Sequence, residues 1–139
     1  MADSRVGRII RGDACVAEGS AHLSRQDPRF AAALELTGPL PLRRKPDGFE
    51  QLLSAIVSQQ VSTAAASAIW KKMKAARLTG PRKVLWASEE DLRTAGLSRQ
   101  KVRYAKALAE ARIDYAALRE APTEEVIATL VEVPGIGVW

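Results

Sequence analysis

The chain has 139 residues, of which 47% are hydrophobic, 27% charged and only 5% aromatic, and its formal net charge is +5. This length allows one domain with a real core but not two independent ones. A single cysteine, Cys15, and a single histidine, His22, exclude an internal disulfide, a cluster held by several thiolates and a histidine-built metal site. No apolar run reaches membrane-spanning length and the first residues lack a secretory apolar core, so we expect a cytoplasmic protein with no membrane partner.

The first third of the sequence predicts a loose start, two helices and an extended connector. Residues 1–20 are expected to be poorly ordered, although residues 14–25 form a weak helix candidate. Asp27 as N-cap and Pro28 at the first helical position predict a better helix, which a Gly-Pro pair ends. Three prolines between residues 38 and 46 then predict an extended connector, because proline forbids a helix there.

The next segment predicts two amphipathic helices joined by a polar break. Asp47 is the expected N-cap of the first helix, whose apolar residues recur at i, i+3, i+4, i+7 and i+8. The pattern stops at Gln59 and Gln60 and resumes at Ser62, a second N-cap. We expect the second helix to end at the Gly80-Pro81 pair. The apolar face of the first helix comprises Phe49, Leu52, Leu53, Ile56 and Val57.

Two short helices are predicted next. The first lies around residues 82–86. The second begins at Ser88, which forms a capping box with Asp91, and ends at Gly96 in a left-handed conformation.

The last third predicts two longer helices. Ser98 caps a helix with one basic face and one apolar face. Thr123 begins the final helix, which Pro134 ends. The expected inward residues are Val102, Ala105, Leu108 and Ala109 in the first of these helices and Val126, Ile127, Leu130 and Val131 in the second. With six or seven helices and no period-two alternation, the fold class is all-α, a multi-helix array.

The residues after the final helix are the most informative of the sequence. Gly135 and Gly137 flank a single apolar residue, Ile136, and this spacing indicates a tight turn with left-handed backbone. Such a turn directs successive backbone N–H groups outward, where they can hold a phosphate without any positive side chain. Ile136 would face inward and fix the turn to the core. The alternative is a plain helix end with glycine.

Two other segments carry polar groups that can serve a site. Gln59 and Gln60 lie at an abrupt join between two helices, where amides can cap helix ends or reach a base edge. When these two glutamines are considered alone, capping of helix ends is the favoured interpretation. The segment Gly96–Arg103 is a turn followed by a basic helix, which is either a solvated face or a second phosphate contact.

In this order and spacing, the three segments resemble the helix-hairpin-helix DNA glycosylases. Residues 49–62 are similar to the helix-loop F-x-x-L-x-x-A-I-x-x-Q-Q-x-S of that superfamily, and residues 96–101 to its G-L-S-x-x-K turn. Residues 133–139 are similar to its hairpin, in the form typical of bacterial 3-methyladenine DNA glycosylase II. The resemblance covers roughly residues 20 to 139, so we expect residues 21–139 to be a partial glycosylase domain that is cut off after the hairpin.

The resemblance implies an enzyme that bends double-stranded DNA, flips a damaged nucleotide into a pocket and hydrolyses its N-glycosidic bond. Gln60 would fill the gap left by the flipped base, and Trp139 would line the lesion pocket, where its π-face suits an alkylated purine. The hairpin carbonyls would hold a monovalent cation, with no other cofactor, and the complete protein would be a monomer near the bacterial nucleoid. The implied DNA-binding residues are Gln59, Gln60, Ser62, Lys101, Val133, Pro134, Gly135, Ile136 and Gly137.

The resemblance also implies a catalytic Asp beyond a second hairpin helix, and no residue of this chain matches it. Asp91, Asp114 and Glu132 fit better as caps or solvated charges. We therefore expect an N-terminal portion that is inactive on its own, with an apolar face left on its last helix that favours marginal stability or self-association. The alternatives are a non-catalytic helix-hairpin-helix DNA-binding module and a helical interaction domain with no nucleic-acid role.

Overall fold

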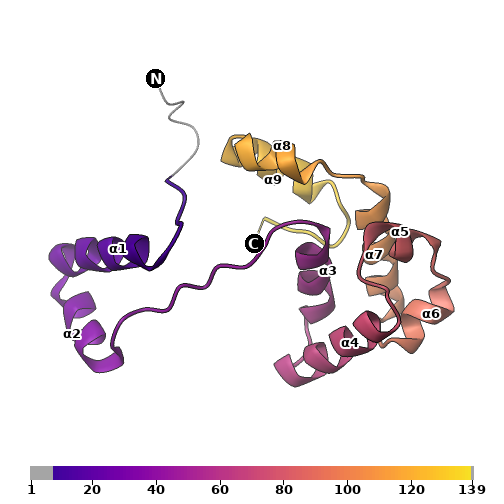
Figure 1. The fold of residues 1–139 in the computed structure, drawn as a ribbon, viewed down its shortest axis with the longest axis horizontal. Helices are drawn as coiled ribbons and strands as arrows, with labels where there is room; N and C mark the ends of the chain where they lie inside the picture. The colour runs from indigo at the N-terminus through magenta and orange to yellow at the C-terminus, as the bar shows by residue number, and fades with distance from the viewer. Residues whose placement is uncertain (1–7, 139) are drawn as a thin grey trace. The chain divides into compact units, whose positions relative to one another are not determined.

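The computed structural model describes residues 8–138, and within them nine helices and no strand are present (Figure 1). The all-α class expected from the sequence is confirmed. The helices are α1 (Asp13–Gln26), α2 (Pro28–Thr37), α3 (Phe49–Ser58), α4 (Thr63–Ala75), α5 (Pro81–Trp86), α6 (Glu89–Thr94), α7 (Arg99–Glu110), α8 (Tyr115–Glu120) and α9 (Thr123–Val131). Helix α8 was not predicted from the sequence, since its six residues show no helical period and no Gly-Pro pair or capping box marks it.

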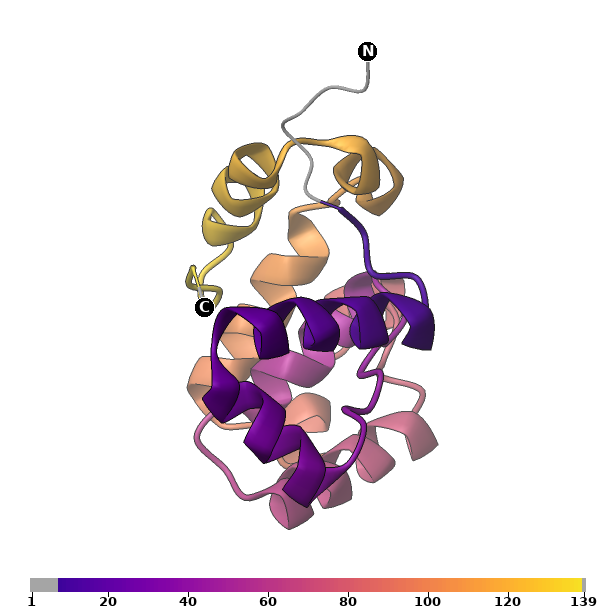
Figure 2. The same cartoon turned by 90° about the vertical axis from the view of Figure 1, so that its left-hand side faces the viewer.

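The chain divides into two compact units between Lys45 and Pro46. In the first unit α1 packs against α2 (Figure 2), and Asp27 caps α2 as predicted by accepting a hydrogen bond from the Arg29 backbone N–H at 2.9 Å. The boundary expected at residue 20 falls inside α1, which is continuous. Neither helix contains a buried residue, so this unit has no core of its own.

The second unit is built around α7, which packs against α3, α5 and α6. The four predicted inward residues of α7 are all buried, and four residues of α3 are buried as well. The apolar spacing of each helix places these residues on one face. Burial of each large aliphatic side chain stabilises the fold by about 1.5–3 kcal/mol. The core comprises Phe49, Leu53, Ile56, Val57, Met73, Leu78, Val84, Leu92, Ala95, Leu97, Val102, Ala105, Leu108, Ala109 and Val133.

Helix α4 is shorter than expected, because it ends at Ala75 and not at the Gly-Pro pair. Arg77 adopts a left-handed conformation with φ of 58°, and Leu78 N–H donates to the Met73 carbonyl at 2.8 Å. This pattern is a Schellman motif, and it turns Leu78 into the core. The favourable burial of that leucine explains an end that the sequence pattern does not mark.

Helix α6 ends as predicted. Gly96 has φ of 115°, and the following Leu97 N–H donates to the Leu92 carbonyl at 3.2 Å. A Cβ atom at Gly96 would lie 2.9 Å from Cγ1 of Ile69 in α4, so both backbone conformation and close helix approach require glycine here. At the other end of α6, the Ser88–Asp91 capping box is also present.

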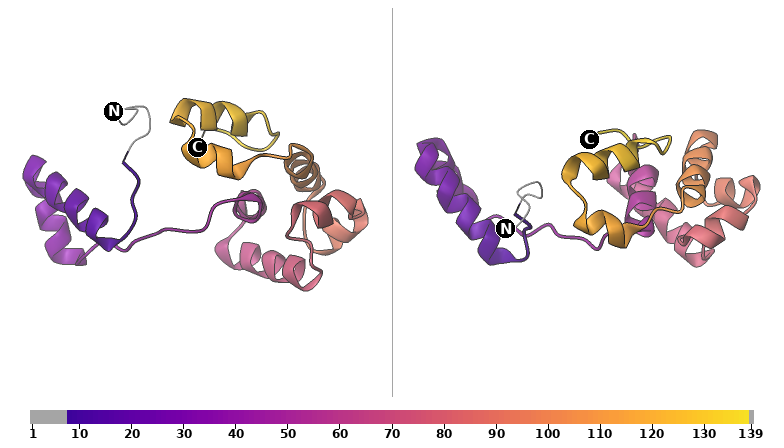
Figure 3. Two further views of the ribbon diagram at one scale, coloured as in Figure 1. Left: turned by 45° about the horizontal axis from the view of Figure 1, so that its top comes forward. Right: turned by 90° about the horizontal axis from the view of Figure 1, so that it is seen from above.

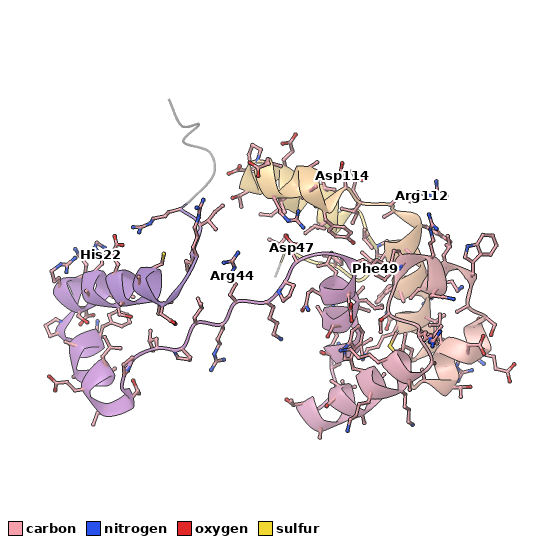
Figure 4. All side chains as sticks on the ribbon, viewed as in Figure 1. His22, Arg44, Asp47, Phe49, Arg112 and Asp114 are labelled. Atoms are coloured by element: carbon pink, nitrogen blue, oxygen red, sulfur yellow. The ribbon has the colours of Figure 1, made fainter. Side chains whose placement is uncertain are left out.

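The expected N-cap role of Asp47 is wrong. Gly48 occupies the N-cap position of α3 with φ of 108°, and no side chain caps the N-terminus of this helix. Asp47 accepts hydrogen bonds from Nε and Nη2 of Arg119, the latter at 2.7 Å, and so ties the start of α3 to α8 (Figure 4). Asp114 does cap a helix, since it accepts from the Ala117 N–H at 3.0 Å at the start of α8.

The predicted inward face of α9 is only half correct. Val126 and Leu130 are half-buried along a hollow shared with Leu52, whereas Ile127 and Val131 are 37% and 39% exposed. Residues 126 and 130 point about 100° away from 127 and 131 around the helix, and the fold covers only the first pair. Helices α8 and α9 come after the central α7 (Figure 3), and neither contains a fully buried residue.

Candidate nucleic-acid interface

Three segments that are far apart in the sequence meet on one face of the second unit. They are the α3–α4 loop, the first turn of α7 and the residues that follow α9. Gln59 Nε2 donates to the Gly135 carbonyl at 3.0 Å, and Lys101 Nζ donates to the Val57 carbonyl at 2.7 Å. A hollow of about 290 Å³ opens there, lined by Gln59, Gln60, Val61, Ser98, Gln100, Lys101 and Tyr104.

Residues 133–138, which we call the hairpin turn, begin with a tight reversal. Ile136 N–H donates to the Val133 carbonyl at 3.1 Å, with proline second and a glycine of φ 93° third in the turn. This arrangement matches a type II turn, which favours proline and then glycine at those positions. Val133 is buried and Ile136 packs half-buried against the core, so the turn is fixed to the unit as the sequence predicted.

The two glycines of the hairpin turn have different reasons to be glycine. The glycine spacing predicted left-handed backbone across the pair, but the structure gives a positive φ to Gly135 and not to Gly137. A Cβ atom at Gly135 would lie 2.4 Å from Cδ2 of Tyr104, whereas one at Gly137 would meet nothing within 4 Å. Packing within the chain therefore requires glycine at position 135. At position 137 only the close approach of an external partner would require glycine.

The hairpin turn also presents free backbone donors. Among the described residues no acceptor is bonded to the N–H groups of Gly135, Gly137 and Val138. Gly137 and Val138 are exposed, so solvent or a ligand satisfies these groups. Such a row of unpaired amides is what the phosphate-holding hypothesis requires.

The two glutamines of the α3–α4 loop have separate roles. Gln59 is engaged with the hairpin turn, while the Gln60 side chain makes no hydrogen bond to the described residues. Gln60 is exposed at the loop tip and has φ of 56°, a left-handed conformation that is uncommon outside glycine. Ser62 accepts from the Ala65 N–H at 3.1 Å and so caps α4 as predicted. Only Gln60 is thus free to reach a ligand.

Lys101 is half-buried, and its ammonium group caps the C-terminal end of α3 through Val57. Helix C-termini attract cations, because their last carbonyls are unpaired and carry partial negative charge. Partial burial lowers the pKa of Lys101 below its ordinary value. Its position beside the hollow keeps the charge near any ligand held there.

The electrostatics of the hollow favour an anion. Its lining contains one ammonium and no carboxylate. The capped first turn of α7 lines it, and its partial positive charge adds to that of Lys101. This face can therefore hold phosphate groups by backbone amides and dipoles with few positive side chains.

Tyr104 and Gln100 belong to this site, although the sequence analysis did not name them. The Tyr104 ring lies directly beneath Gly135, and its hydroxyl accepts from Gln100 Nε2 at 2.6 Å. A tyrosine between two buried positions of α7 is the only sequence signal, and it does not identify the contact. Trp139, the predicted lesion-pocket residue, lies outside the described residues.

Other features of the described residues carry no evident chemistry. A second hollow of about 520 Å³ lies between α5, α7 and α8 and includes Tyr115, whose buried hydroxyl lacks a partner. His22 lies on α1 (Figure 4), and within residues 8–138 no three His, Cys, Asp or Glu side chains are grouped to hold a metal ion. No helix among them has the length and apolar character to cross a membrane.

Comparison with known proteins assigns this arrangement to a family. The model of the HhH-GPD superfamily of base excision DNA repair proteins matches residues 53–133, which include the α3–α4 loop, α7 and the start of the hairpin turn. The chain therefore belongs to the HhH-GPD superfamily, which confirms the resemblance seen in the sequence.

Similar proteins include DNA-3-methyladenine glycosylase 1 of Schizosaccharomyces pombe, with 32% identity over 130 residues, 85% of this chain and 57% of the relative. Two solved structures are also similar. The DNA-3-methyladenine glycosidase of Bacillus halodurans has a TM-score of 0.70 at 35% identity, over 84% of this chain and 57% of that one. The 3-methyladenine DNA glycosylase Mag1 of Schizosaccharomyces pombe, in complex with abasic DNA, has a TM-score of 0.75 at 30% identity, over 88% and 65%. The chain thus spans less than two thirds of the length of these relatives.

Proposed function

We propose that this chain is the DNA-holding portion of a base-excision glycosylase that removes alkylated bases of the 3-methyladenine type from double-stranded DNA. The observation that carries the proposal is the free row of backbone N–H groups in the hairpin turn, next to a loop tip with an unengaged Gln60. The names of the similar proteins support the reaction and the substrate class, and the solved complex with abasic DNA supports the partner.

The hairpin amides would bind one phosphate, and Lys101 would add positive charge in the neighbouring hollow. These contacts position the protein on the duplex without reading its sequence. Gln60 would enter the space left by a flipped nucleotide and hydrogen-bond the orphaned base. No carboxylate lines the hollow beside the hairpin turn, so the group that hydrolyses the glycosidic bond is not among these contacts.

A monovalent cation at the hairpin carbonyls forms part of the proposal. The Val133 and Gly135 carbonyls each accept one hydrogen bond, which leaves a second lone pair on each oxygen. Hard carbonyl oxygens suit an alkali cation, and it would neutralise charge between the turn and a phosphate. We propose no other cofactor, and a location with the chromosome.

Binding and excision separate this proposal from its alternatives. The chain is titrated with two duplexes of one sequence, one intact and one with a central abasic-site analogue, and is then incubated in excess with a duplex that carries an alkylated purine. We expect salt-dependent binding with preference for the abasic duplex, and no release of the alkylated base. Equal affinity for both duplexes would favour a non-catalytic binding module. If the chain bound neither duplex, a helical interaction domain would be favoured. Rapid base release would mean that the catalytic group lies within this chain.

A further inference from the structure

The hairpin turn and the α3–α4 loop are joined directly by one side chain. The Gln59 amide donates to the Gly135 carbonyl at 3.0 Å, across 76 residues of sequence. The Gln59 amide is therefore hydrogen-bonded within the protein, whereas the side chain of its neighbour Gln60 has no hydrogen bond to the described residues. The two adjacent glutamines therefore differ in function, although the sequence analysis grouped both as DNA contacts.

The Gly135 carbonyl is a sensitive point at which to hold the hairpin turn. The Gly135 carbonyl and the Ile136 N–H belong to the same peptide unit. This N–H closes the turn by donating to the Val133 carbonyl at 3.1 Å. Fixing the carbonyl fixes the plane of that rigid peptide and the direction of its own N–H, at Ile136, which closes the turn. The Gln59 bond thus holds the turn from which the free N–H groups of Gly137 and Val138 follow.

Two further contacts complete the support. Tyr104 closes the other side of the turn, since its ring leaves no room for a Cβ atom at Gly135. Lys101 holds the Val57 carbonyl, two residues before Gln59, so the base of the loop is also anchored to α7. The loop and the hairpin turn are both tied to one helix and to each other.

We propose that Gln59 is a positioning residue that sets the register between the hairpin amides and the loop tip. Its amide holds the turn on the Tyr104 ring, so that the phosphate-binding amides and Gln60 contact one stretch of duplex at a fixed separation. The part of this inference that concerns DNA rests on the proposed function; the internal coupling does not.

The internal coupling is tested without DNA on the full chain. Gln59→Met keeps the length of the side chain but removes the donor, and Gln60→Met is the matched control one residue away. Amide hydrogen exchange of Ile136 is followed by NMR together with its nitrogen shift. We expect Gln59→Met to accelerate this exchange about three- to tenfold, the worth of one hydrogen bond, and Gln60→Met to leave it unchanged. Unchanged exchange in Gln59→Met, or equal acceleration in both variants, would overturn the coupling.

Gln59→Glu gives a second, pH-resolved readout. An ionised carboxylate only accepts hydrogen bonds, but a protonated carboxyl group donates one. We expect the Ile136 nitrogen shift of this variant to move toward the wild-type value as pH falls below about 4.3, the ordinary pKa of glutamate. A shift that stays displaced while the protein remains folded at low pH would contradict the donor role of residue 59.

Duplex binding then separates positioning from direct contact. We expect Gln59→Met to weaken binding to intact and abasic duplexes by the same factor, about three- to tenfold. Gln60→Met should weaken only the abasic complex. If Gln59→Met lost only the abasic preference, Gln59 would be a base-contacting residue. If the wild-type chain bound no duplex, the proposed function would fail, while the exchange measurement would still decide the internal coupling.

Discussion

At the scale of single residues, the site is organised by what each side chain already contacts. Gln59 and Lys101 are engaged with backbone carbonyls, and Gly135 rests on Tyr104. Among the described residues, by contrast, the Gln60 side chain has no hydrogen-bond partner and a Cβ atom at Gly137 would meet nothing within 4 Å. The free positions are the ones that a ligand can reach. The engaged positions hold the free ones in place.

The two glycines of the hairpin turn give the first prediction. Gly135→Ala should lower the free energy of unfolding by about 2 kcal/mol, because alanine strains at φ 93° and clashes with Tyr104. Gly137→Ala should change stability by less than about 0.5 kcal/mol but weaken duplex binding, since its methyl group would meet only the phosphate. Urea unfolding and duplex titration measure the two effects. Unaltered binding by Gly137→Ala would argue against phosphate held at this amide.

Lys101 gives a second prediction with two readouts. Lys101→Met should remove the cap of α3, which costs about 1 kcal/mol of stability, and should reduce the slope of log affinity against log salt by about 1. Arg103→Met, an exposed residue of the same helix, is the control for stability. A Lys101 variant with wild-type stability would show that the Val57 bond contributes nothing.

At the scale of elements, helix ends were the hardest part to predict. Sequence spacing located the buried faces of α3 and α7, because a 3.6-residue period is a local property, whereas α2 was predicted from its cap and proline and α1 only as a weak candidate. The end of α4 and the capping of α3 could not be predicted, since the burial of Leu78 depends on tertiary packing and Asp47 pairs with Arg119, 72 residues away. In the site, glycine and amide spacing indicated the hairpin turn and the loop. The Tyr104 contact depends on tertiary packing and left no pattern.

Lys106 illustrates the same limit and gives a third prediction. The basic face of α7 was expected to be either solvated or in contact with phosphate, but Lys106 is half-buried and donates to the carbonyls of Val84, Leu85 and Ala87 at the end of α5. Lys106→Met should therefore lower the free energy of unfolding by about 2 kcal/mol, the usual worth of bonds from a charged donor. Lys71→Met, on an exposed face, should be neutral within about 0.5 kcal/mol. Equal melting temperatures for the two variants would refute this account.

At the scale of the whole molecule, the two compact units differ in the buried apolar residues that stabilise them. The unit from Pro46 onward contains the core, and the unit before it contains no buried residue in either helix. The connector between α2 and α3 is extended and largely exposed. The HhH-GPD match lies entirely within the cored unit, which also contains every contact of the candidate interface.

Limited proteolysis tests this division. Trypsin should cut first after Arg43 or Arg44, which are exposed in the connector, because proteases cleave extended backbone fastest. The fragment that follows should persist and retain helical circular dichroism and duplex binding. Early cleavage inside α3 or α7, or loss of binding with the connector cut, would contradict an independently stable unit.

The central claim is that the hairpin turn of this chain holds a DNA phosphate by its backbone. The most direct measurement is fluorescence anisotropy of a labelled duplex with one abasic-site analogue, titrated with the wild-type chain and with Gly137→Ala at several salt concentrations. We predict that log affinity falls linearly with log salt for both proteins. The variant should bind more weakly at every concentration with the same slope, since its added methyl group keeps the phosphate away from the amide and no positive charge is removed. Wild-type binding that is absent or independent of salt, or a variant of equal affinity, would contradict the claim.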